Sequence, residues 1–494
     1  MENSIVEIVA KYAEIQKDKA CFIDEEGITT YGEIWKKIKC IAEKYRAMNI
    51  KKGDCVIVEC TQNVKFIIAA LACQLIEAIF IPIEKQSPVE RVRSIWKDTD
   101  AKLLLSESKY DLPVDKAFIK DVFNDICKES KENFVFPKEE ATAEILYTTG
   151  TTGKSKGIEI TNKNNIALAE NVKYGTEMKS DNVELIPLPL SHSHGLRCCY
   201  ANLLNGSTIA LVDGVTQIKC IFDWMDKYKI TALDLSPSAV LILYKLSKGK
   251  ISQFDSQLDY IQIGTAVLPE ETKQLLISVF PTTRLYNFYG STESGRTCVL
   301  NFAKDKDKKN SVGKPTKNAE FIVTDENRKT ISSSKENMGL LATAGNMNMK
   351  GYWKNPELTL ENMSDGYVYT NDLGYIDEEG YVYVLGRKDD VINCGGIKIS
   401  PEEIEEIVIK NDLVIDCACI AKKHPVLGDA PILFIVIDEI KEYDKNLFGE
   451  WIRENIDANK LPKETKVINQ IPRTYNGKIQ RKELYSVLLD NKEN

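Results

Sequence analysis

The sequence predicts an α/β protein with a large N-terminal domain of α/β subdomains and a small C-terminal α+β domain. Through the first 385 residues, short β-rich runs alternate with amphipathic helical windows, a texture typical of α/β folds. Near residue 386 the chain changes to a charged joint that starts with glycine, Gly386-Arg387-Lys388-Asp389-Asp390. About 105 residues with their own helical and apolar strand patterns follow, enough for a second core. We therefore expect domains at 1–386 and 387–494.

Length and charge exclude several classes of function. A chain of 494 residues exceeds what one hydrophobic core normally serves. The net charge of -8 argues against a nucleic-acid-binding protein. The most apolar window, 66–83, is interrupted by Gln74 and Glu77 and contains Pro82 near its end. It predicts a buried helix and strand, so no transmembrane segment is expected.

Cysteine usage favours a reducing compartment. The thirteen cysteines are spread along the chain, mostly inside apolar runs and without paired CxxC spacing, so we expect buried reduced thiols and a cytoplasmic protein. The N-terminus lacks the basic and apolar regions of a secretory signal. Cys198 and Cys199 follow His192 and His194 closely, but three histidines in the whole chain argue against a zinc cluster.

The segment from Tyr147 to Gly157 is suited to holding phosphate. Its glycines let backbone N–H groups approach an anion, its hydroxyls donate hydrogen bonds, and its lysines supply charge. It is not a P-loop, because Thr148 stands where a Walker A loop needs its first glycine, and because 158–161 alternates like a strand instead of opening a helix. The expected phosphate ligands are Thr148, Thr149, Gly150, Thr151, Thr152, Gly153, Lys154 and Lys156.

A second motif covers residues 286–293, Tyr-Asn-Phe-Tyr-Gly-Ser-Thr-Glu, at the end of an apolar strand. Open α/β sheets bind ligands at such strand ends. Upstream, the small residues of 264–266 leave room for a ligand. The two segments therefore predict a ligand-binding site at this end of the sheet.

These motifs resemble the adenylate-forming superfamily, which includes acyl-CoA synthetases, aryl-CoA ligases, luciferases and peptide-synthetase adenylation domains. Residues 370–374 resemble its Thr-Gly-Asp-Leu motif, 386–390 its hinge, and 472–481 its Pro-Arg-Thr-x-x-Gly-Lys-x-x-Arg motif. The matches follow the family's order from residue 147 to 481. The chain departs from the pattern at Asn371, usually glycine, and at Ser155, usually proline; asparagine tolerates the left-handed backbone that such a turn needs.

The resemblance assigns the nucleotide ligands. Tyr289 would stack on adenine, Thr292 would touch the α-phosphate, and Glu293 would help to hold Mg²⁺. Asp372 would accept hydrogen bonds from the ribose hydroxyls, with Arg387 beside it. The full set expected around adenine and ribose is Gly264, Thr265, Ala266, Asn287, Phe288, Tyr289, Gly290, Asp372 and Arg387.

The resemblance also makes the C-terminal domain a mobile lid. Lys478 would offset the repulsion between the attacking carboxylate and the α-phosphate, an effect of about 3 to 4 kcal/mol for one well-placed donor. Asp389 would be the hinge, and Gly395 and Gly396 would line the tunnel for the thiol. Rotation of such a lid lets one site serve two partial reactions.

The expected acyl pocket contains His192, Gly264, Asn287 and Arg296. Arg296 would either meet a second polar or acidic group of the substrate or pair with a surface acid. An amino-acid substrate is disfavoured, because peptide-synthetase domains use an aspartate in the His192 region and none lies between Leu185 and Cys199.

The resemblance implies ATP-dependent conversion of a carboxylic acid to an acyl-adenylate, with ATP, Mg²⁺ and coenzyme A as the co-substrates and cofactor. Two alternatives remain. The thiol could be the phosphopantetheine of an acyl carrier protein, or the chain could be an inactive nucleotide-binding sensor. Lys478, Glu293 and Asp372 together argue against the sensor.

Overall fold

The computed structural model describes residues 2–124, 130, 132–149, 155–395, 397–438, 441, 443–473 and 479–490. By its internal contacts the chain divides into two compact units, Met1–Phe321 with Thr343–Thr370, and Ile322–Ala342 with Asn371–Asn494. The division runs through the strands β16 (Glu320–Thr324), β17 (Gly339–Ala344) and β20 (Tyr367–Ile376). The domain boundary expected at residue 386 stays a prediction.

A mainly parallel sheet in the larger unit carries the predicted phosphate segment. Its strand order is β18-β8-β7-β4-β3-β5-β6. The central strands are buried along their whole length, which explains why they read as continuous apolar runs. The strands are β3 (Cys55–Glu59), β4 (Ile79–Ile83), β5 (Leu103–Ser106), β6 (Asp115–Phe118), β7 (Thr142–Thr149), β8 (Ser155–Thr161) and β18 (Gly351–Tyr352).

A second sheet of this unit runs in the order β2-β1-β10-β9-β11-β12-β13-β14-β15. The strands from β1 to β13 along this path pair in parallel, whereas β13, β14 and β15 are antiparallel. They are β1 (Ala20–Asp24), β2 (Gly27–Thr30), β9 (Val183–Ile186), β10 (Thr208–Leu211), β11 (Ala232–Leu235), β12 (Tyr260–Ile263), β13 (Arg284–Ser291), β14 (Gly295–Asn301) and β15 (Ser311–Pro315).

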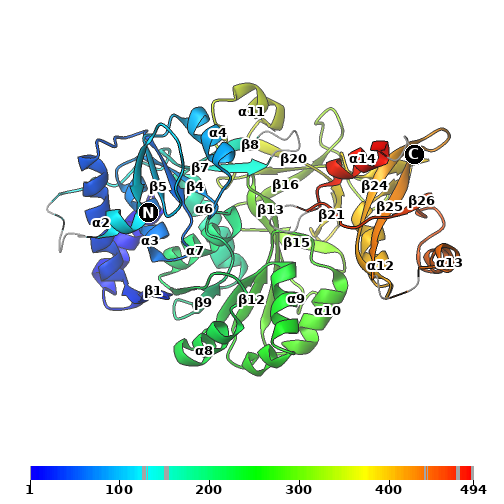
Figure 1. Cartoon of the computed structure of the whole chain (residues 1–494), viewed down its shortest axis with the longest axis horizontal. Helices are drawn as coiled ribbons and strands as arrows, with labels where there is room; N and C mark the ends of the chain where they lie inside the picture. Colours follow the sequence, from blue (N-terminus) through cyan, green and yellow to red (C-terminus); the bar gives the residue numbers. More distant parts are fainter. Residues whose placement is uncertain are drawn as a thin grey trace. The chain divides into compact units, whose positions relative to one another are not determined.

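Helices between the two sheets share one large hydrophobic core with both (Figure 1). They are α1 (Ile5–Ile15), α2 (Tyr31–Ala47), α3 (Val64–Leu75), α6 (Asn162–Gly175) and α7 (Ser193–Asn205). The apolar window 66–83 forms α3 and β4, as predicted, because α3 is buried on every side. Further helices cover the outer faces: α4 (Val89–Thr99) on the first sheet, and α8 (Ile218–Tyr228), α9 (Pro237–Leu246) and α10 (Glu270–Val279) on the second. Two short helices are α5 (Ile119–Phe123) and α11 (Pro356–Asn362), the latter followed by β19 (Met363–Ser364).

The smaller unit has a sheet and a core of its own. Its strand order is β23-β22-β25-β24, with β26 parallel to β25. Long strands β24 and β25 carry apolar side chains on both faces, which pack on helices α12 and α13 on one side and α14 on the other. The elements are β21 (Val382–Arg387), β22 (Ile392–Cys394), β23 (Ile397–Ile399), α12 (Pro401–Val408), β24 (Val414–His424), β25 (Gly428–Ile437), α13 (Lys445–Asn455), β26 (Glu464–Val467) and α14 (Arg481–Asp490).

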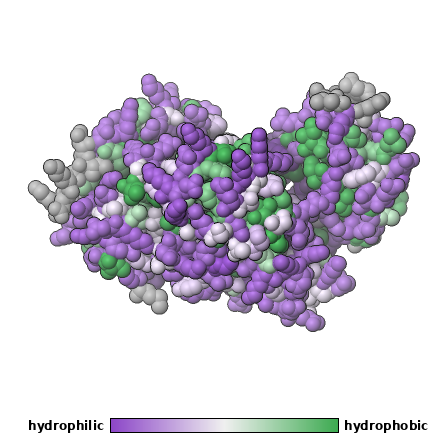
Figure 2. Space-filling view, turned by 90° about the horizontal axis from the view of Figure 1, so that it is seen from below, coloured by the Kyte–Doolittle hydropathy of each residue, from purple (hydrophilic) through white to green (hydrophobic). Residues whose placement is uncertain are grey.

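The surface and the cysteines test two sequence expectations. Within the described parts of the chain, no helix is both long and apolar enough to cross a membrane. On the face drawn in Figure 2, hydrophilic residues predominate and hydrophobic ones form small scattered patches. Among the described residues, eleven cysteines are free and ten of these are buried, as expected. Cys40 differs, because it is disulfide-bonded, so the expectation of reduced thiols is wrong at this position.

Candidate active site

The two ends of the predicted phosphate segment belong to the paired strands of a β-hairpin. Strands β7 and β8 are antiparallel, with Thr148 opposite Lys156 and Thr149 opposite Ser155. A strand therefore follows the loop, which confirms the argument against a P-loop. The connecting residues Gly150, Thr151, Thr152, Gly153 and Lys154 lie outside the described residues. Thr148 and Lys156 flank the connection from its two sides.

A buried tyrosine joins this hairpin to the carboxylate expected to hold Mg²⁺. The Tyr352 hydroxyl donates a hydrogen bond to Glu293 Oε1 at 3.1 Å, and the Lys156 ammonium lies 5.6 Å from the centre of the Tyr352 ring. Tyr352 pairs with Ile158 in the ladder between β18 and β8, which fixes it at the base of the hairpin. The backbone carbonyl of Glu293 accepts from Met349 N–H at 2.8 Å. Sequence reasoning missed Tyr352, because it lies in none of the motifs.

The turn between β13 and β14 presents Thr292 and Glu293. A Cβ on Gly290 would lie 1.7 Å from the carbonyl oxygen of Gly295, so only glycine fits at this close approach. Ser294 is buried and its N–H donates to Ser291 Oγ at 3.1 Å, which tightens the turn. Thr292 and Glu293 are half-buried at its tip, where their side chains can reach a ligand.

The expected adenine segment carries backbone strain. Thr265 has φ of 79°, which is unfavourable for a β-branched residue, and it is exposed together with Ala266. Strain of this kind is concentrated at binding sites, because the surrounding structure must hold it in place. Tyr289 is half-buried, and its ring centre lies 6.5 Å from that of Phe321.

In the smaller unit, the structure brings the expected ribose residues together. Asp372 is opposite Arg387 in the ladder between β20 and β21, and Arg387 Nη1 lies 3.6 Å from Asp372 Oδ1. Asn371 has φ of 60°, so it takes the left-handed conformation predicted for a position where relatives have glycine. Asp389, the expected hinge residue, is exposed.

The remaining residues predicted to belong to the lid are only partly described. Gly395 has φ of 60° and donates its N–H to the Leu427 carbonyl at 2.8 Å. Gly396 and Lys478 lie outside the described residues. Arg481, the last residue of the Lys478 motif, is buried against Glu402 and Glu405 of α12, and so anchors α14 to the core of the smaller unit.

Among the acyl-pocket candidates, His192 faces an acid. Its Nε2 lies 3.3 Å from Glu84 Oε1, and burial lowers the pKa of this histidine, opposed by the charge of Glu84. Gly264 is covered by a different histidine, because a Cβ added to it would lie 2.5 Å from His194 Cε1. Asn287 is buried, 6% exposed, and its Oδ1 accepts no hydrogen bond from the described residues.

Arg296 does not pair with a surface acid. It is 6% exposed, donates to Gln262 Oε1 at 2.6 Å, and approaches the fully buried Asp234 with 3.9 Å between Nη2 and Oδ1. His194 Nε2 is 2.6 Å from the same Asp234 oxygen. Gln262 in turn donates to Glu184. We call this group the polar layer; it consists of Glu184, Asp234, Gln262 and Arg296 from the sheet and His194 from α7.

Protonation within the polar layer follows from burial. Desolvation and the nearby charge of Asp234 raise the pKa of Glu184 to about 7. Desolvation and the charge of Arg296 lower the pKa of His194, which is therefore neutral at pH 7. Sequence reasoning missed Glu184, Asp234 and Gln262. A signal was present, because each is a single polar residue inside a short apolar strand, and such a residue needs a buried partner.

The layer does not fit a metal site. Donor atoms of His194, Cys198 and Asp234 lie within 4.8 Å of one another. Arg296 Nη2, however, is only 2.7 Å from Cys198 Sγ, and burial raises the pKa of this thiol well above its ordinary value. Zinc ligands must be deprotonated, and here the guanidinium already provides the positive charge.

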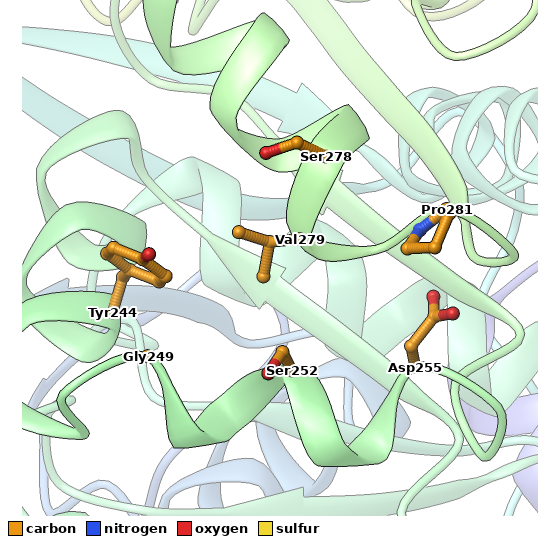
Figure 3. A pocket seen from close by; sticks show the side chains of 7 residues that line it. All are labelled: Tyr244, Gly249, Ser252, Asp255, Ser278, Val279 and Pro281. Atoms are coloured by element: carbon orange, nitrogen blue, oxygen red, sulfur yellow. The ribbon is translucent and has the colours of Figure 1, made fainter.

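A pocket of about 420 Å³ lies elsewhere, between α9, the 3₁₀ helix η1 (Lys250–Phe254) and the end of α10. Figure 3 shows side chains of Tyr244, Val279, Ser252 and Asp255 around it. The Asp255 carboxylate accepts hydrogen bonds from the backbone N–H groups of Thr282 and Thr283, so it serves the local fold. None of the expected site residues lines this pocket.

Comparison with known proteins identifies the class. The model of the AMP-binding enzyme family matches residues 9–353, and that of the AMP-binding enzyme C-terminal domain matches residues 403–478. The chain belongs to the AMP-binding enzyme family. The superfamily expected from the motifs is therefore confirmed.

Individual relatives are named CoA ligases, and a solved structure has the same fold. The chain is 27% identical to a 2-succinylbenzoate–CoA ligase of Bacillus cytotoxicus, over 95% of this chain and 96% of the relative. It is 26% identical to 4-coumarate–CoA ligase 3 of Arabidopsis thaliana, over 95% and 89% of the two chains. The o-succinylbenzoate CoA synthetase of Bacillus subtilis, solved with ATP and magnesium ion, has a TM-score of 0.86 at 21% identity, with 97% of this chain and 99% of that chain covered. This likeness confirms the predicted fold class, a mixed α/β protein with a large N-terminal domain and a small C-terminal domain.

Proposed function

We propose that this chain activates a carboxylic acid with ATP, releases pyrophosphate, and transfers the acyl group from the acyl-adenylate to coenzyme A. The reaction class, an AMP-forming acid–thiol ligase, rests on membership of the AMP-binding family and on relatives named CoA ligases that match nearly the whole chain. In the structure, the proposal rests on the grouping of Lys156 and Glu293 around Tyr352. A cation and a carboxylate thus lie next to the same side chain.

The proposal gives each described residue of the nucleotide site a task. Lys156 and Thr148 hold phosphate oxygens beside the hairpin connection, and Thr292 donates to the α-phosphate. Asp372, next to Arg387, accepts hydrogen bonds from the ribose hydroxyls. Tyr289 offers its half-buried ring to adenine.

Glu293 fits a site for Mg²⁺. Its carboxylate is half-buried and has the Tyr352 hydroxyl as a neutral hydrogen-bond donor, and a carboxylate oxygen is a ligand that Mg²⁺ prefers. Bound there with the triphosphate, the ion would neutralise phosphate charge. The B. subtilis synthetase has been solved with both ATP and magnesium ion, which supports the same pair of ligands here.

Acyl-adenylate formation needs positioning and charge stabilisation but no covalent enzyme nucleophile. The acid's carboxylate oxygen attacks the α-phosphorus, the bond to the bridging oxygen breaks, and pyrophosphate leaves. Lys478 supplies the positive charge at the attacking and bridging oxygens. The thiol of coenzyme A then attacks the acyl carbon and AMP leaves. The lid, with Asp389 as the hinge and Gly395 and Gly396 in the thiol tunnel, separates the two steps.

Coenzyme A is the proposed thiol, because the relatives are CoA ligases. No observation favours a carrier protein. A cytoplasmic location belongs to the proposal and is supported by the many free thiols. The inactive-sensor alternative predicts nucleotide binding without turnover.

ATP–pyrophosphate exchange tests the proposal. We expect exchange with at least one short, aryl or hydroxy acid, and AMP release that requires coenzyme A. Lys478→Ala should lower exchange by about 10²- to 10³-fold while preformed acyl-AMP still reacts with coenzyme A. Lys482→Ala, an exposed lysine four residues further on, is the matched control. No exchange with any acid would favour the sensor, and equal loss in both half-reactions would refute the role of Lys478.

A further inference from the structure

The polar layer lies where the acyl pocket is expected. The imidazole of His194 packs directly against Gly264, and the guanidinium of Arg296 lies 4.7 Å from the centre of the Phe288 ring. Gly264 and Arg296 are both candidates for the acyl pocket. The substrate's far end would therefore meet buried charged and amide groups instead of an apolar wall.

The charge of Arg296 is already balanced. Asp234 is fully buried beside it, and Glu184, linked through Gln262, adds a second acid to the same layer. His194 contributes no charge because it is neutral. A second carboxylate on the substrate would meet these acids without an unpaired cation to receive it, and an ammonium group would meet the guanidinium.

The layer nevertheless has unused hydrogen-bonding atoms. Asp234 Oδ2 is an acceptor without a donor among the described residues, and Arg296 Nε is a donor without an acceptor among them. The two side chains are 0% and 6% exposed. Leaving such buried atoms unpaired is unfavourable, and more so for a charged group. A hydroxyl group both donates and accepts, so it can satisfy an atom of each kind.

The polar layer also limits the length of the acyl group that the pocket can accept. A long apolar or aromatic acyl group would have to displace the contacts among Arg296, Asp234 and Gln262. Breaking a buried ion pair is strongly unfavourable, because a charge is left buried without a partner. A short chain meets this layer only with its terminal hydroxyl and leaves the contacts among Arg296, Asp234 and Gln262 intact.

We propose that this enzyme activates a short carboxylic acid bearing a hydroxyl group, which the polar layer recognises, in preference to apolar acids, dicarboxylates and amino acids. The inference rests on the proposed function and narrows its substrate class. In this proposal Arg296 meets a polar group of the substrate, as expected from the sequence, but that group is a neutral hydroxyl and not a second acid.

A panel of acids matched in length tests this with the unmodified enzyme. ATP–pyrophosphate exchange is measured with butanoate, 3- and 4-hydroxybutanoate, succinate, 4-aminobutanoate, hexanoate and cinnamate. We expect the better hydroxy acid to exceed butanoate and succinate in kcat/KM by about tenfold or more, since a site built for a hydroxyl rejects analogues without it. Preference for hexanoate, cinnamate, succinate or 4-aminobutanoate overturns the inference but leaves the proposed function standing. Absence of exchange with every acid overturns both.

A variant identifies the residue responsible. Asp234→Asn keeps the shape of the side chain but removes the charge that balances Arg296. We expect the ratio of succinate to hydroxybutanoate activity to rise about tenfold or more, because Arg296 becomes free to bind a carboxylate. Asp213→Asn, an exposed carboxylate two residues after β10 of the same sheet, should leave the ratio unchanged. An unchanged ratio in a folded Asp234→Asn enzyme refutes the proposal; if that variant does not fold, the panel on the unmodified enzyme decides.

Discussion

The proposed nucleotide site and the proposed acyl pocket of the larger unit, called here the nucleotide side and the acyl side, are built in different ways. On the nucleotide side, Lys156, Thr292 and Glu293 are half-buried on turns and strand ends, each inside a short motif. On the acyl side, Glu184, Asp234 and Gln262 are fully buried and come from separate strands, and none lies in a motif.

This difference has a physical consequence. A half-exposed charge on a turn keeps part of its hydration, so its task depends mainly on local backbone and on the ligand. A fully buried charge depends on its partner, because nothing else replaces water. Substitutions on the nucleotide side should therefore affect every acid alike, and those in the polar layer should change selectivity or protonation.

Helix α7 offers the strongest test, because another buried ion pair lies on it beside the polar layer. Arg197, 1% exposed, pairs with the buried Glu144 and donates to Asn165 Oδ1 at 2.6 Å. Arg197→Met should destabilise the larger unit by about 3 to 5 kcal/mol by leaving Glu144 unpaired, and lower the melting temperature. Arg46→Met breaks a half-exposed pair and should cost at most about 1 kcal/mol. A changed acid preference in a folded Arg197→Met enzyme would show that the two clusters are coupled, against our comparison.

Glu293→Gln tests the nucleotide side. The amide still accepts from Tyr352 but cannot offer Mg²⁺ a charged oxygen, so exchange should fall about 10²-fold with all acids of the panel. The measurement is kcat/KM for exchange as Mg²⁺ is varied. Glu357→Gln, an exposed acid in α11, is the control. If exchange fell with only some of the acids, Glu293 would affect selectivity, and this result would contradict the difference between the nucleotide side and the acyl side.

Glu184→Gln tests protonation of the polar layer. The pKa of Glu184 is raised in the folded state to about 7 from 4.5, so folding favours the protonated form. Its contribution to stability is complete below about pH 4.5 and is lost as the pH rises through 7, by about 3 kcal/mol in total. The variant cannot titrate, so the unmodified enzyme should lose melting temperature relative to it between pH 5 and 8. The exposed control Glu25→Gln should follow the unmodified enzyme, and parallel curves for Glu184→Gln would contradict the buried position.

Tyr352→Phe should give the smallest effect. It removes the hydrogen bond to Glu293 but keeps the ring beneath Lys156, so KM for MgATP should rise about three- to tenfold with kcat nearly unchanged. Excess Mg²⁺ should restore part of the affinity. Tyr367→Phe loses a comparable bond, to the exposed Glu320 at 3.0 Å, and should have no effect. A fall in kcat alone would point to a role other than holding Glu293.

Sequence patterns were sufficient where chemistry is local. The strand after the phosphate loop follows from the alternation of 158–161, and the left-handed turn at Asn371 follows from the tolerance of asparagine for positive φ. The fold class follows from the alternation of apolar strands with amphipathic helices. The roles of Lys478 and the connection 150–154 stay predictions, because these positions lie outside the described residues.

The family, the α/β architecture and the motif residues that point to ATP chemistry could all be inferred from the order of the amino acids, because spacing along the chain sets which groups share a turn or a strand end. The surroundings of these residues depend on how the chain folds. Asp234 reaches His194 from β11, although no aspartate stands near His192 in sequence, and Tyr352 reaches Glu293 from β18. Sheet order and helix packing, and not spacing along the sequence, determine which residues are in contact. Burial then makes each polar contact costly to lose.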